Sequence, residues 1–323
     1  MKFHWGDFLD RESGHWAIIP NAERFNYHFE DITSAPKSTT ILTITKNDQN
    51  WETAAKLPFL EELTLGNPNP AQLEFVSQLW RIKRLRISHA RPKTLDFLSR
   101  LDQLEELVLE YVSKFTDLSP IGSVKNLRSL YIENLRGVRD FSGLEGARKL
   151  LHLSITGTLD WAQPIEDFGF LSSLKRLEIL HLRQIRSHAK YPALLPLCEL
   201  KELQKIYIYP SAFPLEEYAA LEANIPNVKG AVRDPVERVV WGTRPVPSDD
   251  IRSKLPVEVL KEKYPEVFIT YDGRRMEPFE WKYLFLGKGE RSISCDSKTA
   301  EKRRAAHKAR YYAAVNKFKV SQS

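Results

Sequence analysis

Apolar side chains recur along residues 54–210 at a spacing that changes within each unit. The pattern is Leu-x-x-Leu-x-x-Leu-x-x-Leu-x-Leu, with Ile, Val or Ala allowed in place of Leu. Three-residue spacing places apolar groups on one face of a helical or 3₁₀ segment, whereas the final Leu-x-Leu has the two-residue alternation of a strand. The penultimate positions of the units are Leu63, Leu85, Leu107, Leu130, Leu153, Leu180 and Ile206.

This pattern predicts an α/β solenoid, because each unit is one turn of a coil whose apolar face is buried only by stacking on its neighbours. We expect the Leu-x-Leu strands to form a parallel sheet on the concave face. Residues 39–45, where Leu42 and Ile44 alternate with threonines, predict one further strand before the first unit. The two longest intervals contain residues 160–164 and 186–196, which we expect to project as adaptable loops.

Residues 54–210 resemble the leucine-rich-repeat family, in particular the short repeats of the internalin type. The segments 117–121 (Asp-Leu-Ser-Pro-Ile) and 140–144 (Asp-Phe-Ser-Gly-Leu) resemble the convex side of those repeats. The resemblance implies a recognition protein, although a fold alone does not define a function. One departure concerns the Asn that the family places three residues after the strand's last Leu. Here those positions hold Pro68, Ala90, Val112, Leu135, Thr158, Ile185 and Ser211, so we expect apolar packing or other bonds to hold the turns.

The leucine repeat is absent from both ends of the chain, and we expect these ends to form separate segments. Residues 1–38 are rich in aromatic side chains, and we expect them to form an N-terminal cap over the first coil. The repeats span residues 39–210 and precede a proline-rich C-terminal capping segment, residues 211–295. Within that segment, the aromatic stretch 278–285 predicts either buried core or a docking patch. Residues 296–323 are predicted to be a basic helical tail.

Positive charge is concentrated in that tail. The formal net charge of the chain is +6, and residues 296–323 alone carry eight basic and two acidic residues. Such a helix is either a solvated terminus or a site for a polyanion such as RNA, DNA or an acidic protein face. The residues of the polyanion alternative are Lys302, Arg303, Arg304, Lys308 and Arg310.

Other function classes find little support in the sequence. No apolar stretch approaches the roughly 18 residues of a membrane span, and the first residues lack the apolar region of a secretory signal, so we expect a cytoplasmic protein. Cys198 and Cys295 give neither a disulfide framework nor a metal-binding spacing. No His-Glu-x-x-His or other metal-binding histidine spacing, no phosphate-binding loop and no Gly-x-Ser-x-Gly elbow occurs. We therefore expect no catalytic residue, metal or cofactor. An enzyme within residues 233–295 is the weakest alternative, because that segment contains no histidine.

The repeat also predicts which side chains share the concave surface, because those that flank the inward leucines face it. Glu62, Arg84 and Glu106 alternate in sign on adjacent strands, which is either a charge ladder without further role or part of a binding surface. Tyrosine, histidine and arginine gather toward the C-terminal repeats and favour a protein or peptide partner over a merely solvated sheet face. The predicted contact residues are Arg84, Arg86, Glu106, Glu110, Tyr131, Glu133, His152, His181, Arg183, Tyr207 and Tyr209.

Overall fold

The chain divides into two compact units. The computed structural model describes residue 6 and residues 9–270 and 272–320 of the 323-residue chain. Unit 1 comprises Met1–Ala212 and Asn224–Val232, and unit 2 comprises Phe213–Ala223 and Arg233–Ser323. Unit 1 contains the repeats, and unit 2 contains most of the C-terminal segments.

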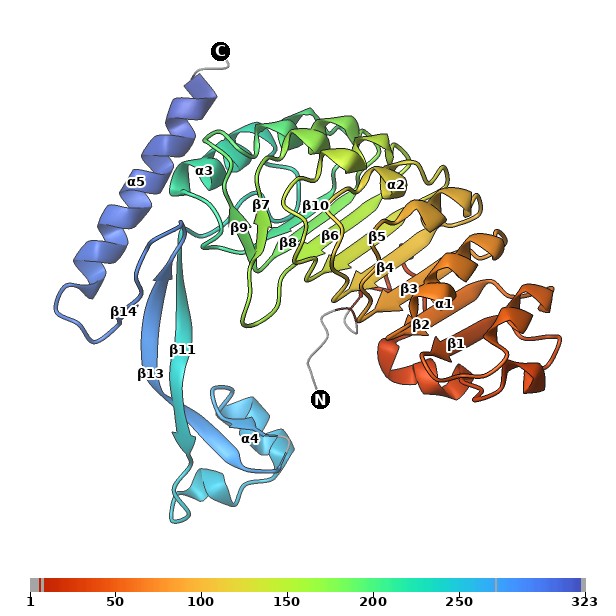
Figure 1. Ribbon diagram of the computed structural model, residues 1–323. Helices are drawn as coiled ribbons and strands as arrows, with labels where there is room; N and C mark the ends of the chain where they lie inside the picture. The colour runs from red at the N-terminus through yellow and green to blue at the C-terminus, as the bar shows by residue number, and fades with distance from the viewer. Residues whose placement is uncertain (1–5, 7–8, 271, 321–323) are drawn as a thin grey trace. The chain divides into compact units, whose positions relative to one another are not determined.

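An eight-stranded parallel sheet forms one face of unit 1 (Figure 1). Successive repeats contribute successive strands, and Leu63, Leu85, Leu107 and Leu130 lie in register on neighbouring strands. The predicted solenoid with its concave parallel sheet is therefore confirmed, including the additional first strand. The strands in spatial order are β1 (Ile41–Thr45), β2 (Glu62–Gly66), β3 (Arg84–Ser88), β4 (Glu106–Glu110), β5 (Ser129–Glu133), β6 (His152–Thr156), β8 (Ile179–Arg183) and β10 (Lys205–Ile208).

Short helical segments form the other side of each coil. The two α-helices among them are α1 (Pro70–Phe75) and α2 (Ser119–Gly122). The 3₁₀ segments are Trp51–Lys56, Val76–Gln78, Asp96–Arg100, Ser142–Gly146, Gly169–Ser173 and Leu195–Glu199. Between these segments and the sheet lies the core, in which Leu85, Leu107 and Leu130 are fully buried. Each such leucine stabilises the fold by roughly 1.5–3 kcal/mol relative to an exposed one.

Apolar packing holds the turns that follow the strands. Ala90, Val112 and Leu135 occupy the family's Asn position and are buried, as the sequence predicts. Tyr111, which precedes Val112, has a φ of 56°, and Asn134, which precedes Leu135, has a φ of 58°. The chain therefore turns sharply at each strand end and directs the next side chain into the core.

The two insertions project only in part: residues 188–192 are largely exposed and lie outside any strand, whereas each insertion also contributes to a short strand. Strands β7 (Gln163–Ile165) and β9 (Ile185–Ser187) pair with each other in parallel. Ile165 is fully buried and Ile185 nearly so. Each insertion therefore adds a short strand, because its β-branched residue gains more by burial than by exposure.

Only part of the N-terminal segment covers the first coil. The 3₁₀ segment Asn21–Tyr27 lies beside β1, where His28 pairs with Thr43, and the 3₁₀ segment Ile32–Ser34 lies beside the 3₁₀ segment Trp51–Lys56. The expectation of a cap over the first coil is wrong for residues 9–20, which follow a different path described below. The aromatic residues Phe3, Trp5 and Phe8 lie outside the described residues.

Unit 2 is built around two long antiparallel strands, β11 (Val236–Pro245) and β13 (Arg275–Phe285). Strands β12 (Phe268–Ile269) and β14 (Ile293–Ser294) pair with β13. The other elements are α3 (Leu215–Asn224), the 3₁₀ segment Ile251–Ser253, α4 (Val257–Lys263) and α5 (Ala300–Val320). In the aromatic stretch 278–285, Tyr283 and Phe285 are buried with Val236 and Ala300, whereas Phe279 is exposed. Among the described residues, no helix combines the length and apolar character needed to cross a membrane.

Candidate functional site

The inner wall of the repeat sheet is already occupied in part by the chain itself. Residues 9–20, which we call the N-terminal strap, lie on the side chains that project from β2 to β6. The backbone N–H groups of Ala17 and Ile18 donate to the Glu106 carboxylate at 2.9–3.0 Å, and that of Ile19 donates to Glu62 at 2.9 Å. The wall therefore binds the strap through the strap's backbone groups. Burial raises the pKa of Glu106, and the hydrogen bonds from the Ala17 and Ile18 N–H groups act in the opposite direction.

Two further hydrogen bonds come from the wall to the strap's carbonyl groups. The Arg86 guanidinium donates to the Ile19 carbonyl at 3.1 Å, and the Ser129 hydroxyl donates to the His15 carbonyl at 2.5 Å. Together with Glu62 and Glu106, these contacts come from four neighbouring repeats. The strap is consequently held across the strands by donors and acceptors that the wall presents to its backbone.

An apolar contact fixes the middle of the strap. Trp16 and Ile18 are buried against Val108 and Tyr131 of the wall, and Leu9 packs on the same cluster. The Trp16 indole N–H donates to Nδ1 of His152 at 3.2 Å. Burial, with His181 next to it, holds the pKa of His152 well below its usual range. A neutral ring is the form that accepts this hydrogen bond.

Beneath the strap lies a buried ion pair. Arg86 Nη1 lies 3.0 Å from Glu110 Oε1, and both side chains are fully buried. On the next strand, the Tyr131 hydroxyl donates to Glu133 at 2.8 Å, and burial raises the pKa of Tyr131 well above its usual range. These side chains pair with one another inside the protein and are buried, so they are parts of the folded core.

The predicted concave residues thus separate into a covered and an open group. All of them stand on the wall, as the alternation predicts, but the expectation that they form one accessible surface is wrong. The strap and neighbouring side chains bury Arg86, Glu106, Glu110, Tyr131, Glu133 and His152. Arg84 is half-buried and pairs with Glu62 at 2.7 Å. The group that is not buried comprises His181, Arg183, Tyr207 and Tyr209.

Together with Lys205, the last four form what we call the open patch, on β8, β10 and the residue after β10. Tyr207 and Tyr209 expose 39% and 42% of their surface. The Arg183 guanidinium lies 4.5 Å from the centre of the Tyr207 ring, and the His181 ring meets the same ring edge-on at 6.0 Å. Burial, followed by the positive charges of Arg183 and Lys205, lowers the pKa of His181 to about 4. The patch is therefore aromatic and carries positive charge on Arg183 and Lys205.

Sequence reasoning missed the strap residues. Their partners are 43 to 136 positions away in the chain, and backbone donors leave no signal in side-chain identity. The one available sign was the apolar run Trp16-Ala17-Ile18-Ile19, which was assigned to the cap over the first coil.

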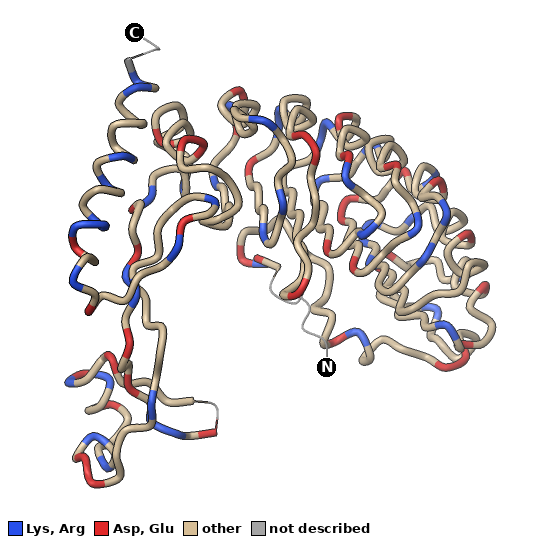
Figure 2. The backbone as a smooth tube through the Cα atoms, turned by 60° about the vertical axis from the view of Figure 1, so that its left-hand side comes forward, with Lys and Arg blue, Asp and Glu red and all other residues tan. Residues whose placement is uncertain are grey.

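The basic tail folds as the helix α5, which the sequence predicts. Figure 2 shows basic residues recurring along this helix. Most of the predicted polyanion-binding residues, however, lie in ion pairs inside unit 2: Arg303 and Arg310 with Glu290, Arg304 with Glu301, and Lys308 with Asp234. Lys302 is exposed and makes no ion pair within the part of the chain that the structure describes. Tyr311 and Val315 are buried, so α5 is a packed element and not a solvated terminus.

Across the described ranges, no group of three or more His, Cys, Asp or Glu side chains is arranged to hold a metal ion. Repeated coils, a parallel sheet in register and the leucine pattern define unit 1 as a leucine-rich-repeat solenoid.

Among known proteins, similarity to this chain is found in solved structures. No protein-family model and no curated protein matches the sequence. Similar solved structures include the internalin inlF from Listeria monocytogenes, at 19% identity over 57% of this chain and 58% of that one, with a TM-score of 0.40. Internalin C2 of the same organism is 23% identical over 53% of this chain and 73% of that one, with a TM-score of 0.39. A leucine-rich-repeat protein of Leptospira interrogans is 16% identical over 61% of this chain and 58% of that one, with a TM-score of 0.34. The chain thus spans less than two thirds of the first internalin.

Proposed function

We propose that unit 1 is a non-enzymatic recognition module whose open patch binds a protein or peptide partner. The observation that carries this proposal is the pair of exposed tyrosines, Tyr207 and Tyr209, beside Arg183 at the C-terminal end of the inner wall. Tyrosine and arginine contribute most often to the energetic centre of an interface, because they bury a large area with little loss of conformational freedom.

The charge of the patch specifies the partner further. Arg183 and Lys205 give the patch positive charge, and the Asp10 carboxylate of the strap lies 3.6 Å from the Lys205 ammonium group. A partner with complementary negative charge would bind faster and with the correct orientation. The partner surface would therefore combine apolar groups, which cover Tyr207 and Tyr209, with a carboxylate that meets Arg183.

The test is affinity capture from cell lysate with the full chain and three variants, Y207A, Y209A and R183A. Each variant should lose the same set of captured proteins, with binding weakened at least about tenfold, the effect of 1.4 kcal/mol at an interface. The matched control is Y312A, which removes an equally exposed tyrosine from α5 of unit 2. Unchanged capture by Y207A and Y209A would reject the open patch as the binding surface.

A further inference from the structure

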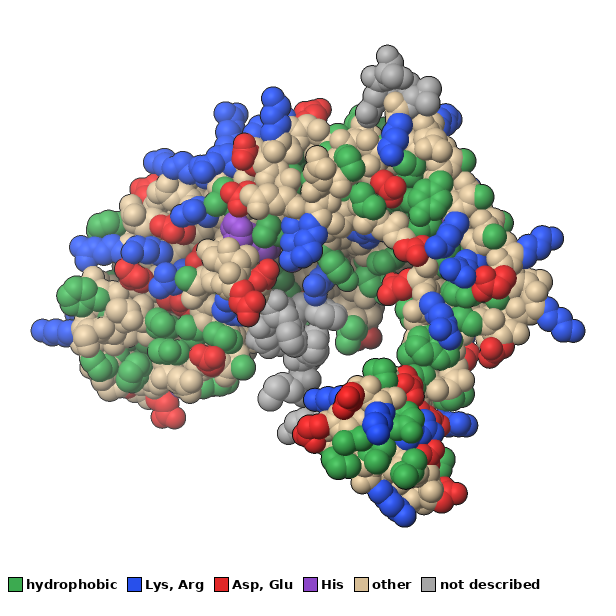
Figure 3. Space-filling view, turned by 180° about the vertical axis from the view of Figure 1, so that it is seen from behind, with side chains coloured by type: hydrophobic (Ala, Val, Ile, Leu, Met, Phe, Trp, Pro, Cys, Tyr) green, Lys and Arg blue, Asp and Glu red, His purple; other side chains and the backbone are tan. Residues whose placement is uncertain are grey.

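A second apolar surface lies at the other end of the solenoid, in the first repeats. Figure 3 shows hydrophobic side chains gathered on the N-terminal coils, on the left in that view. Two aromatic residues that precede neighbouring strands of this region, Phe59 and Trp80, expose 61% and 53% of their surface. Exposed aromatic side chains that lie together are typical of an interaction site, whereas single exposed apolar residues are ordinary.

Phe59 and Trp80 line one groove of about 570 Å³, together with Pro58 and Leu60. We call it the aromatic groove. A narrower slot of about 120 Å³ adjoins it between the first two coils, with Leu57, Leu60, Leu79 and Ile82 on its apolar side and Gln78 and Arg81 on its polar side. An apolar cavity of roughly 150 Å³ holds a benzene ring, so the slot is large enough for the end of one apolar side chain.

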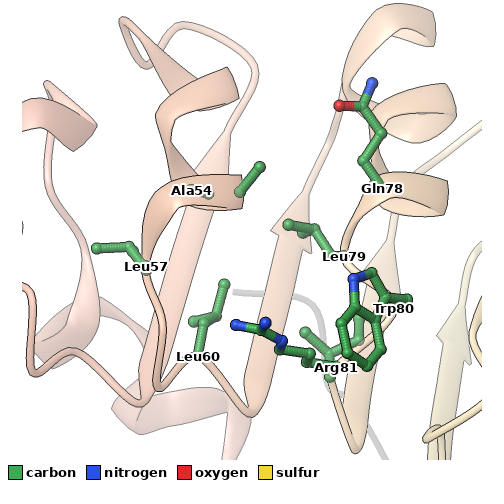
Figure 4. Close-up of a pocket in the computed structure, with 9 residues that line it drawn as sticks. Ala54, Leu57, Leu60, Gln78, Leu79, Trp80 and Arg81 are labelled. Carbon is green, nitrogen blue, oxygen red and sulfur yellow. The ribbon is translucent and has the colours of Figure 1, made fainter.

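Among the described residues, Arg81 is the only charged side chain that lines both the groove and the slot. Figure 4 shows Arg81 reaching across the gap between the coils toward Leu60, with the Trp80 ring beside it. Its guanidinium lies 4.7 Å from the centre of the Trp80 ring. Lys83, which also lines the groove, pairs with Glu61 at 2.7 Å. Arg81 makes no ion pair among the described residues, so the groove carries one uncompensated positive charge.

We propose that the aromatic groove binds a protein segment that presents an apolar side chain next to a carboxylate. The apolar side chain enters the slot under Trp80, and the carboxylate accepts hydrogen bonds from Arg81, whose planar guanidinium suits a carboxylate better than an ammonium group does. This site is separate from the open patch, because the groove lies at β1 to β3 and the patch at β8 and β10. Failure of either proposal leaves the other standing.

The test uses nuclear magnetic resonance of the ¹⁵N-labelled full chain, with the indole N–H signal of Trp80 assigned through the W80F variant. The probe is the peptide acetyl-Asp-Leu-Phe-Asp-amide. Two comparison peptides separate the contributions: acetyl-Lys-Leu-Phe-Lys-amide reverses the charge, and acetyl-Asp-Gly-Ser-Asp-amide lacks the apolar groups. We expect the acidic apolar peptide to shift the Trp80 signal and to bind at least about tenfold more tightly than the other two, as expected when both apolar burial and charge pairing contribute. The indole signal of Trp51, whose ring packs on Phe75, is the internal control and should not move.

The R81E variant should reverse the order of the two charged peptides, and R81Q should make them bind alike. Arg81 is exposed, so both variants should fold, which their thermal unfolding temperatures would verify. The proposal is overturned if the basic peptide binds wild type as tightly as the acidic one, if R81E keeps the wild-type order, or if the peptides leave the Trp80 signal in place. It is also overturned if the Trp80 signal shifts with protein concentration alone, since a second copy of the chain would then be the occupant.

Discussion

The backbone N–H of Ile18 donates to the carboxylate of Glu106 at 2.9 Å, across 88 positions of the sequence. This contact places an extended segment of the chain on the inner wall of its own solenoid. The backbone groups of the strap are bound by two carboxylates, a guanidinium and a hydroxyl of the wall, and the Trp16 side chain donates to His152. An extended segment of almost any sequence could make such hydrogen bonds, so Trp16 and Ile18 supply the selectivity through their burial against Val108 and Tyr131.

We expect Glu106→Ala to loosen the strap without unfolding the sheet. The change removes a charged acceptor from the N–H groups of Ala17 and Ile18, which should cost the strap about 2–3 kcal/mol. Hydrogen exchange at these two amides should become about 30- to 150-fold faster, whereas exchange at the core amides of β4 should not change. Glu106→Gln retains one acceptor oxygen and should give an intermediate rate. Unchanged exchange in both variants would mean that the apolar contacts alone hold the strap.

A second prediction concerns the buried pair of Arg86 and Glu110. Removing one charge leaves the other buried and unpaired, so Arg86→Met alone should destabilise unit 1 by about 3–5 kcal/mol. The double variant R86M/E110L removes both charges, and it should recover most of that loss, because Arg86 Nε and Glu110 Oε2 already have no hydrogen-bond partner among the described residues. Urea unfolding of the two variants measures the difference. A double variant as unstable as the single one would show that the pair itself stabilises the fold.

The solenoid could be predicted because its information is local and repeated. Leu85, Leu107 and Leu130 each stand in the same position of a unit, and one rule places all three on adjacent strands. The turn positions also followed from the sequence, because Ala90 and Val112 cannot form an amide ladder and must pack.

The strap and the tail could not be predicted, since their partners are distant and non-periodic. The hydrogen bond from Ala17 to Glu106 and the one from Lys308 to Asp234 form only when the chain has folded. Charge counting along the sequence therefore suggested a free basic helix, and alternation along the strands suggested an open concave face. Both inferences placed the side chains on the correct element. They missed the strap that covers part of the concave face and the acidic residues that pair with the basic helix.

Core substitutions should distinguish repeat packing from surface effects. Leu107→Ala removes a fully buried side chain from the middle of the sheet, and we expect a loss of about 2–5 kcal/mol in the free energy of unfolding. Because each repeat is stabilised by its neighbours, exchange protection should fall in β3 and β5 as well as in β4. Leu159→Ala, at a position that is 66% exposed, is the control and should change stability by less than about 0.5 kcal/mol. Equal effects of the two changes would contradict the assigned core.

The last prediction is that unit 1 loses stability in mild acid through two histidines of the inner wall. Burial lowers the pKa of His152 well below its usual range and that of His181 to about 4. Both groups therefore bind protons more readily in the unfolded chain, whose histidine pKa is about 6.5. Stability is full above that value and falls as the pH decreases toward 4, by about 2 kcal/mol per histidine between pH 6.5 and pH 5. Glu106 acts in the opposite direction, because its raised pKa favours the folded state as the carboxylate protonates. Urea midpoints at pH 7 and pH 5 measure the sum, and His181→Gln should remove about half of the histidine contribution. A variant with the wild-type pH dependence would mean that the pKa of His181 does not differ between the folded and the unfolded chain.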